Sequence, residues 1–341
     1  MRYLVTGGAG FIGSHLVEAL VAAGETVAVL DDLSTGNLRN LAAVRDRIRF
    51  IRGSVTDPEA CRRASEGVDY VFHQAALTSV PRSVDEPVAA HEINTAGTLN
   101  ILIAARHAGV RRVVYAGSTA AYGHSLKLPN HEDMPARPRS PYAATKLAAE
   151  VYCKALCATY GLETVTLRYF NVFGPRQDPG SPYAAVIPRF ILAALRGEPP
   201  VIYGDGGQTR DFVYVANVVH ANLLACHALG RDVVGQVLNV GCGEALAIRR
   251  LWELIQELTG TRLPAQYAPG RLGEVRDSRA SIERIRSAIG YTPEVELEAG
   301  LRLTIDYYRE AEARRYYEVP VGEDSLSPPP RARASRATLR G

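Results

Sequence analysis

The sequence predicts an α/β protein in which a doubly wound parallel sheet carries a smaller α/β lobe. Three observations support this prediction. Short apolar segments alternate with helical segments through the first half of the chain, the connections between them are short, and a glycine-rich turn follows the first strand. A chain of 341 residues is long enough for two lobes around a shared cleft. We expect the sheet in 1–172 and 212–241, the smaller lobe in 173–211 and 242–318, and a disordered tail in 319–341.

The first predicted elements are two strands with a helix between them, at Tyr3–Thr6, Phe11–Ala23 and Thr26–Leu30. The turn before the helix reads GGAGFIG, with a glycine at every third residue. The first of these glycines permits a tight turn, the second lets a pyrophosphate approach the backbone, and the third lets the helix pack close to the sheet (Gly7, Gly10 and Gly13). A helix start attracts anions because its N–H groups are free. We therefore predict a dinucleotide site at this turn.

Two carboxylates, Asp31 and Asp32, end the second predicted strand. A carboxylate at this position accepts a hydrogen bond from a ribose 2′-hydroxyl and repels a 2′-phosphate. The sequence therefore favours NAD over NADP.

The alternation of strands and helices continues to residue 118. Further strands are predicted at Ile48–Ile51, Tyr70–His73 and Arg112–Gly117, and helices at Pro58–Ala64 and Pro87–Ala108. Because parallel strands end at one edge of a sheet, we expect the ligand beyond their carboxyl ends.

Tyr142 and Lys146 lie four residues apart in the run SPYAATKLAAE, which places both side chains on one face of a predicted helix. A phenol with an unperturbed pKa of about 10 is a poor base at neutral pH. A neighbouring ammonium and the positive charge of an oxidised nicotinamide both favour the phenolate and lower that pKa. Ser118, at a strand end, can pass a substrate proton to Tyr142. The three residues predict oxidation of an alcohol by a nicotinamide.

Five separated motifs, GGAGFIG, HQAALTSVPRS, YAGSTAAYG, PYAATK and LRYFNVFGPRQDP, resemble the extended short-chain dehydrogenase/reductase family, specifically its nucleotide-sugar epimerases. The resemblance implies a Rossmann fold, NAD as the cofactor, and Ser118, Tyr142 and Lys146 as the catalytic residues. It assigns cofactor binding to Gly7, Gly10, Phe11, Ile12, Gly13, Asp31, Asp32, Ser54, Val55, Gln74, Ala75, Ala76, Asn94, Tyr142, Lys146, Tyr169 and Phe170. Ser54 departs from the pattern, because the family often has an aspartate there.

The same resemblance implies a substrate site for a UDP-sugar. Its residues are Ser83, Ser118, Thr119, Asn171, Ala185, Val186, Tyr203, Arg210, Arg271, Glu274 and Ser278. Arg210 and Arg271 are expected on the diphosphate, because guanidinium groups form bidentate, charge-assisted hydrogen bonds. Ser278 corresponds to a position that gates the hexose, and its small side chain leaves room for a 2-acetamido group. For Ser83, a role at a helix start is an equal alternative.

The implied reaction is the reversible 4-epimerisation of a UDP-hexose through a 4-keto intermediate with transient reduction of NAD. UDP-GlcNAc/UDP-GalNAc is the first expectation and UDP-Glc/UDP-Gal the second. Related dehydratases carry an Asp-Glu pair directly after the serine or threonine, where this chain has Thr119 and Ala120. A UDP-glucuronate 4-epimerase, another nucleotide-sugar oxidoreductase or dehydratase, and a non-catalytic NAD-binding regulatory protein stay open as alternatives.

Composition sets the remaining expectations. The formal charge of +3 gives no reason to expect nucleic acid, and the chain has no 18-residue apolar run, so we expect no membrane span. The odd number of cysteines, five, without zinc-like spacing indicates no metal site, and the cytoplasm is the expected compartment. In the family the helices equivalent to Pro87–Ala108 and Tyr142–Tyr160 pair across a homodimer, which we expect here.

Overall fold

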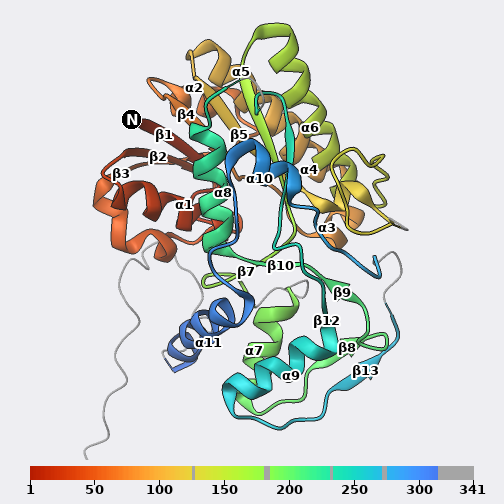
Figure 1. The fold of residues 1–341 in the computed structure, drawn as a ribbon. Helices are drawn as coiled ribbons and strands as arrows, with labels where there is room; N and C mark the ends of the chain where they lie inside the picture. Colours follow the sequence, from red (N-terminus) through yellow and green to blue (C-terminus); the bar gives the residue numbers. More distant parts are fainter. Residues whose placement is uncertain (125–126, 180–184, 231–232, 271–274, 314–341) are drawn as a thin grey trace, which may run out of the picture.

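The computed structural model describes residues 1–124, 127–179, 185–230, 233–270 and 275–313. Its centre is a seven-stranded sheet in the order β3-β2-β1-β4-β5-β6-β11, in which all neighbouring strands are parallel (Figure 1). The predicted doubly wound α/β fold is therefore confirmed. The strands of this sheet are β1 (Arg2–Thr6), β2 (Thr26–Asp31), β3 (Ile48–Arg52), β4 (Tyr70–His73), β5 (Arg112–Ser118), β6 (Glu163–Tyr169) and β11 (Val237–Val240).

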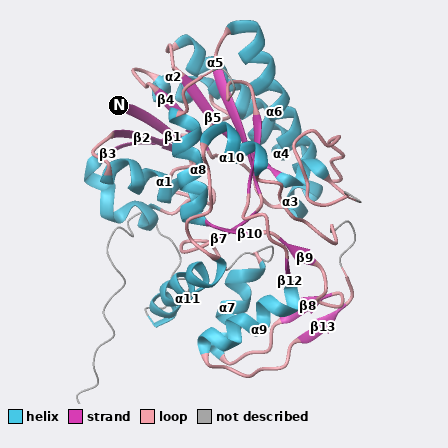
Figure 2. Ribbon diagram, viewed as in Figure 1, coloured by secondary structure: helices cyan, strands magenta, loops and turns pink. Residues whose placement is uncertain are grey.

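Helices cover both faces of the sheet, with the strands between them (Figure 2). Successive strand residues point to opposite faces, so Tyr3 and Val5 pack into one apolar core and Leu4 into the other. The first core lies under α1 (Phe11–Ala22), α8 (Val215–His227) and α10 (Glu283–Ile289). The second lies under α2 (Pro58–Ser65), α5 (Gly97–His107) and α6 (Pro141–Tyr160).

The helix predicted over Pro87–Ala108 is interrupted. It consists of α4 (Pro87–His91), a π-helical turn η2 (Glu92–Ala96) and α5. Such turns frequently occur at functional sites. Three further short helices lie in segments for which the sequence had indicated none: η1 (Leu38–Arg47), α3 (Val80–Asp85) and η3 (Thr119–Tyr122).

The smaller lobe occupies the lower half of Figure 1 and has its own apolar core, in which the rings of Phe190 and Trp252 meet edge to face at 5.5 Å. Three pairs of short strands link it together, β7 with β10, β9 with β12 and β8 with β13. Its helices are α7 (Val186–Arg196), α9 (Ile248–Thr259) and α11 (Leu297–Ala313), and its strands β7 (Asn171–Phe173), β8 (Val201–Tyr203), β9 (Thr209–Arg210), β10 (Phe212–Tyr214), β12 (Leu246–Ala247) and β13 (Gln266–Ala268).

The last helix, α11, begins at Leu297, and its residue Leu301 belongs to the core of the smaller lobe. Within the described ranges, the chain has no helix with both the length and the apolar character required to cross a membrane.

Candidate active site

The glycine turn leads into the uncapped N-terminus of α1, with free space at Gly10. Gly7 has φ +65°, and a Cβ there would lie 2.8 Å from the Ala75 nitrogen. A Cβ on Gly13 would lie 2.1 Å from the Gly7 oxygen, so the helix packs directly on the turn. Gly10 differs, because a Cβ added there would meet only the Gly7 oxygen, at 3.1 Å. α1 also starts without a side-chain cap and without an acidic residue in its first turn. The turn therefore has the space and the N–H groups that a pyrophosphate needs.

Asp31 lies beside this turn at the end of β2. Its carboxylate accepts hydrogen bonds from the Ala9 nitrogen (2.9 Å) and the Leu33 nitrogen (2.8 Å). Burial raises the pKa of the Asp31 carboxyl, while these two N–H groups oppose the rise. Asp32 is exposed and accepts from the Ser34 nitrogen at 2.9 Å. Asp31 is thus the carboxylate that borders the turn. It is the last residue of β2, and Asp32 follows the strand directly.

The predicted catalytic residues come together at the same edge of the sheet. Ser118 ends β5, and its side chain lies near enough to Tyr142 on α6 to lower the pKa of the phenol. Lys146, one turn further along α6, donates to the Ala116 oxygen at 2.9 Å. The Lys146 ammonium also lies 5.1 Å from the centroid of the buried Tyr115 ring. A phenol, an ammonium and a small alcohol therefore occupy one corner of the structure, at the β5–α6 junction.

The protonation of these groups follows from their burial. Burial raises the pKa of Tyr142, and the hydrogen bond from Ser118 partly lowers it again. Burial lowers the pKa of Lys146 to about 8. With the protein groups alone, Tyr142 is therefore a neutral phenol at neutral pH and Lys146 is mostly an ammonium. The sequence had predicted that the Lys146 ammonium lowers the Tyr142 pKa. In the structure burial raises that pKa, and Ser118, not Lys146, opposes the rise.

The start of α6 is closed by two serines. Ser140 caps the helix by accepting from the Ala143 nitrogen at 3.2 Å. Ser83, on α3, accepts from the Tyr142 nitrogen at 3.0 Å and donates to the Val80 oxygen at 2.6 Å. The side chain of Ser83 is fully buried, so its hydroxyl serves the helix that carries Tyr142. This is the helix-start role, although the residue belongs to α3 and acts on α6; sugar binding by Ser83 stays a prediction.

A buried polar network joins two of the predicted cofactor residues, Gln74 and Tyr169, to α8. The hydroxyl of Tyr169, the last residue of β6, lies 3.2 Å from Gln74 Oε1 and 3.0 Å from Asn222 Oδ1, and donates its one hydrogen to either of them. Asn222, on α8, has no exposed surface and also donates from Nδ2 to the Tyr169 hydroxyl at 2.8 Å. Sequence reasoning missed Asn222. An amide among the apolar residues of VVHANLLACHA was the available signal, because a buried amide requires partners.

Asn94 lies in the π-helical turn, and its side chain is engaged by the protein. Its Oδ1 accepts from the Leu77 nitrogen (2.7 Å), and Nδ2 donates to the Leu77 oxygen and to Thr145 Oγ1, both at 3.1 Å. Asn94 thus joins the segment after β4 to the helix of Tyr142. Ser54 Oγ accepts from the Thr56 hydroxyl at 2.9 Å, and Val55 is buried beside α5.

A buried ion pair also holds α6 against the sheet. Arg168 of β6 donates to Glu150 through Nε at 2.8 Å and through Nη2 at 2.7 Å. Glu150 lies one turn beyond Lys146, so this pair orients the catalytic face of the helix. The sequence had not singled out either residue.

Of the predicted substrate residues, the structure brings Arg210 and Ser278 together at β9. The Arg210 guanidinium donates to the oxygens of Thr209 (2.8 Å) and Arg276 (2.9 Å), and the Ser278 nitrogen donates to the Thr209 oxygen (3.2 Å). Asn171 is exposed at the start of β7, and Thr119 follows Ser118 in η3. Ala185 and Val186 begin α7, and Tyr203 ends β8. Arg271 and Glu274 lie outside the described residues.

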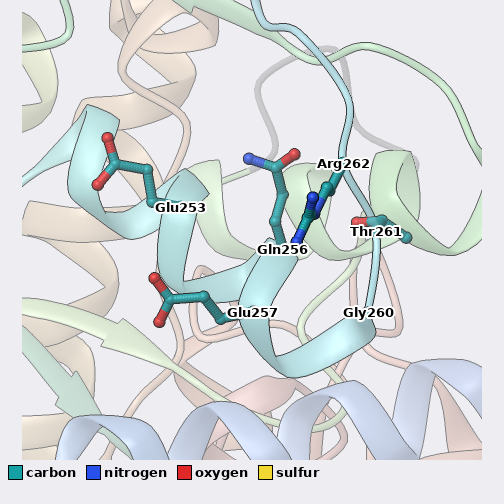
Figure 3. A pocket seen from close by; sticks show the side chains of 6 residues that line it. All are labelled: Glu253, Gln256, Glu257, Gly260, Thr261 and Arg262. Atoms are coloured by element: carbon teal, nitrogen blue, oxygen red, sulfur yellow. The ribbon is translucent and has the colours of Figure 1, made fainter.

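Two surface hollows lie elsewhere on the described part of the chain. One, of about 420 Å³, is at the end of α9 and is lined by Glu253, Gln256, Glu257, Gly260, Thr261 and Arg262 (Figure 3). The other, of about 810 Å³, runs along α8 beside Ala288 and Ile289. Neither is lined by a predicted site residue. The described residues also contain no group of three or more histidine, cysteine or carboxylate side chains that could hold a metal ion.

Comparison with known proteins assigns the family. Residues 3–241 match the NAD dependent epimerase/dehydratase family. The chain belongs to this family. A UDP-glucose 4-epimerase of Mycolicibacterium smegmatis is 41% identical over 313 residues, which cover 91% of this chain and 99% of the relative.

Two solved structures of epimerases agree with the family assignment. The UDP-N-acetylglucosamine 4-epimerase of Methanobrevibacter ruminantium, solved with UDP-N-acetylmuramic acid, superposes with a TM-score of 0.86 at 40% identity and covers 91% of this chain and 98% of its own. The UDP-glucose 4-epimerase of Thermus thermophilus, solved with NAD, has a TM-score of 0.84 at 42% identity and covers 91% and 100%. The predicted resemblance to nucleotide-sugar epimerases is confirmed. NAD is the cofactor of this epimerase/dehydratase family member, and its open turn at Gly10 fits that group.

Proposed function

We propose that the protein is an NAD-dependent UDP-sugar 4-epimerase. The observation that carries this proposal is the meeting of Ser118, Tyr142 and Lys146 at the same sheet edge as the open glycine turn. The close relatives with this activity span nearly the whole chain and support the same conclusion.

The proposed chemistry begins with a proton on the sugar 4-hydroxyl. Ser118 lies against Tyr142 and can relay that proton, while the phenolate form of Tyr142 accepts it. Bound NAD⁺ supplies the acceptor for the hydride of carbon 4, and its positive charge favours the Tyr142 phenolate. The Lys146 ammonium, fixed to the Ala116 oxygen, holds positive charge one turn away.

Inversion requires the 4-keto sugar to present its other face to the same edge. Return of the hydride from the reduced cofactor to carbon 4, together with return of the proton from Tyr142 and Ser118 to the oxygen, would reverse the configuration at carbon 4 and restore NAD⁺. The nucleotide must therefore be held firmly and the sugar loosely. The predicted anchors agree with this division, because Arg210 and Tyr203 lie in the smaller lobe, while Ser118 ends β5 of the main sheet and Tyr142 lies on α6 beside it.

We propose that the enzyme accepts both UDP-glucose and UDP-N-acetylglucosamine. Ser278 lies beside Thr209 of β9, next to Arg210, where a small side chain leaves room for a 2-acetamido group. Replacing Ser278 with tyrosine should abolish turnover of UDP-GlcNAc and preserve turnover of UDP-glucose. An unchanged ratio of the two kcat/KM values would remove Ser278 from the sugar pocket.

The deciding experiment supplies UDP-glucose, UDP-GlcNAc or UDP-glucuronate to the purified enzyme without added nicotinamide and follows the 4-epimer by NMR. Epimer without stoichiometric growth of the reduced-nicotinamide absorbance supports the proposal. Net absorbance growth indicates an oxidoreductase instead. Tyr142→Phe should lower kcat by about 10³-fold or more and leave NAD⁺ binding intact, because it removes only the proton acceptor. Undiminished activity of this variant would remove Tyr142 as the base.

We also propose a homodimer built on α4, α5 and α6, which lie together on one side of the main sheet (Figure 1). Apolar side chains are exposed on this side, including Val88 (69%) and Val151 (56%). Val151→Glu should convert the dimer to a monomer in sedimentation experiments. Leu303→Glu, at a comparably exposed position on α11, is the matched control and should leave the dimer intact. All five cysteines are free thiols, which supports a reducing compartment such as the cytoplasm.

A further inference from the structure

Asp211 is a fully buried carboxylate directly between β9 and β10. Its oxygens accept hydrogen bonds from the nitrogens of Cys242 (2.8 Å), Gly243 (2.9 Å) and Ala280 (3.0 Å). The backbone oxygen of Asp211 also accepts from the Asn171 nitrogen at 3.0 Å. One residue therefore joins the start of β7, the loop after β11 and the segment around residue 280.

The joined segments carry the predicted substrate residues. Asn171 is itself a partner of Asp211, and Arg210 is its neighbour in sequence. Ser278 lies two residues before Ala280 and donates to the Thr209 oxygen on the other side of Arg210. All three residues are thus tied to residue 211, Asn171 through its main-chain oxygen and the segment of Ser278 through its carboxylate, although they are far apart in the sequence.

The backbone is shaped to enclose this carboxylate. A Cβ added to Gly241 would lie 3.0 and 3.1 Å from its two oxygens and 2.8 Å from the Ala280 side chain. An apolar side chain at position 211 would leave three buried N–H groups without an acceptor, which is costly. The site therefore requires an acceptor of this size.

The charge state follows from the surroundings. Burial raises the pKa of the Asp211 carboxyl to about 6, the three N–H groups oppose the rise, and Glu244 adds to it. Asp211 is consequently mostly ionised at pH 7, when its hydrogen bonds are charge-assisted.

The same contact extends toward the catalytic residues. Ala280 pairs with Asn130, whose nitrogen donates to the Arg279 oxygen (2.7 Å) and whose oxygen accepts from the Ser281 nitrogen (2.8 Å). Asn130 belongs to the loop that connects β5 to α6, between Ser118 and Tyr142. The substrate segments and the catalytic loop therefore share one anchor.

We propose that the Asp211 carboxylate is a positioning residue that assembles the binding site for the UDP moiety. This inference rests on the proposed function. Asp211 does not touch the substrate; it fixes the backbone that presents Asn171, Arg210 and Ser278.

The test compares Asp211→Asn with the parent enzyme. Asparagine keeps the size but turns one acceptor into a donor that faces an N–H group. We expect the Kd for UDP, measured by calorimetry, and the KM for the UDP-sugar to rise about tenfold or more, with kcat changed less than about threefold and the Kd for NAD⁺ less than about twofold. The matched control is Asp205→Asn, which removes an exposed carboxylate that pairs with Arg276 at 3.1 Å. It should leave all four quantities within about twofold.

A second variant covers the case in which Asp211→Asn does not fold. Gly241→Ala pushes a methyl group against the same two oxygens without changing the charge, and it should reproduce the selective loss of UDP affinity. Unchanged UDP affinity in a folded variant, or an equal loss of UDP and NAD⁺ affinity, overturns the inference. A parent enzyme that does not bind UDP contradicts the proposed function itself, and the inference falls with it. Parent binding of UDP with equal binding by both variants contradicts the inference alone.

Discussion

Two helices begin at the carboxyl edge of the main sheet, and their starts are built in opposite ways. α1 follows the glycine turn, has no side-chain cap, and leaves open space at Gly10. α6 begins with Pro141, which has no N–H group, and two serines accept from the next two nitrogens. The first start is open to an anion, whereas the second is closed by the protein.

The difference separates binding from positioning. Free N–H groups at a helix start attract a pyrophosphate, so α1 can bind the cofactor. Satisfied N–H groups hold the first turn of α6 still, so Tyr142, the second residue of that helix, has a fixed backbone. The following three predictions test this division, beginning with the largest effect.

Gly13→Ala should distort the glycine turn at the N-terminus of α1 and so disrupt the predicted NAD⁺ site. The new methyl group would lie 2.1 Å from the Gly7 oxygen, so the turn or the helix must move. We expect a loss of about 3 kcal/mol or more in the free energy of unfolding and at least about 100-fold weaker NAD⁺ binding. Gly24→Ala is the control, because its φ is also positive (+79°) but no atom lies within 4 Å; it should cost only about 1 kcal/mol and spare NAD⁺ binding.

Acid should lower the free energy of unfolding through His73 of β4, the strand between β1 and β5, which precede α1 and α6. His73, at the end of β4, accepts at Nδ1 from the Thr6 hydroxyl (2.7 Å) and donates from Nε2 to Thr98 (2.9 Å), since the Thr98 hydroxyl itself donates to the Asn94 oxygen. Burial, with a smaller contribution from Lys146, lowers the pKa of His73 to about 3.

Because the unfolded chain takes up the proton near pH 6.5, the stabilisation by neutral His73 is complete above that pH and is lost as the pH falls toward 3. Between pH 7 and pH 5 the parent should lose about 2 kcal/mol more than His73→Asn in urea unfolding. Equal losses in the two proteins would show that His73 is not the group responsible.

Ser83→Ala and Ser140→Ala should each leave one N–H group at the N-terminus of α6 without its side-chain acceptor. Each removes one acceptor from the first turn of α6 and should cost about 1 kcal/mol in thermal or urea unfolding. Only Ser83→Ala frees the Tyr142 nitrogen, so it should lower kcat about fivefold while Ser140→Ala changes it less than about twofold. Equal effects on kcat would contradict a special role for Ser83.

Several elements were predictable because their signals are local. The strands and helices around the glycine turn follow from alternating apolar segments and from glycine spacing, and the structure reproduces them within a residue or so. The π-helical turn within Pro87–Ala108 was not predictable, because the wider turn depends on Asn94 reaching both Leu77 and Thr145.

By itself the sequence predicted the fold class, the first five strands of the sheet and the glycine turn, because each depends on residues that are close together along the chain. Only the tertiary structure decided which buried polar groups form hydrogen bonds with one another. Ser83 accepts from the first turn of α6, Asn222 bonds the Tyr169 hydroxyl, and Asp211 joins three distant segments. The physical reason is that a buried donor or acceptor must find a partner wherever the fold places one, and that choice is made by contacts between residues remote in sequence.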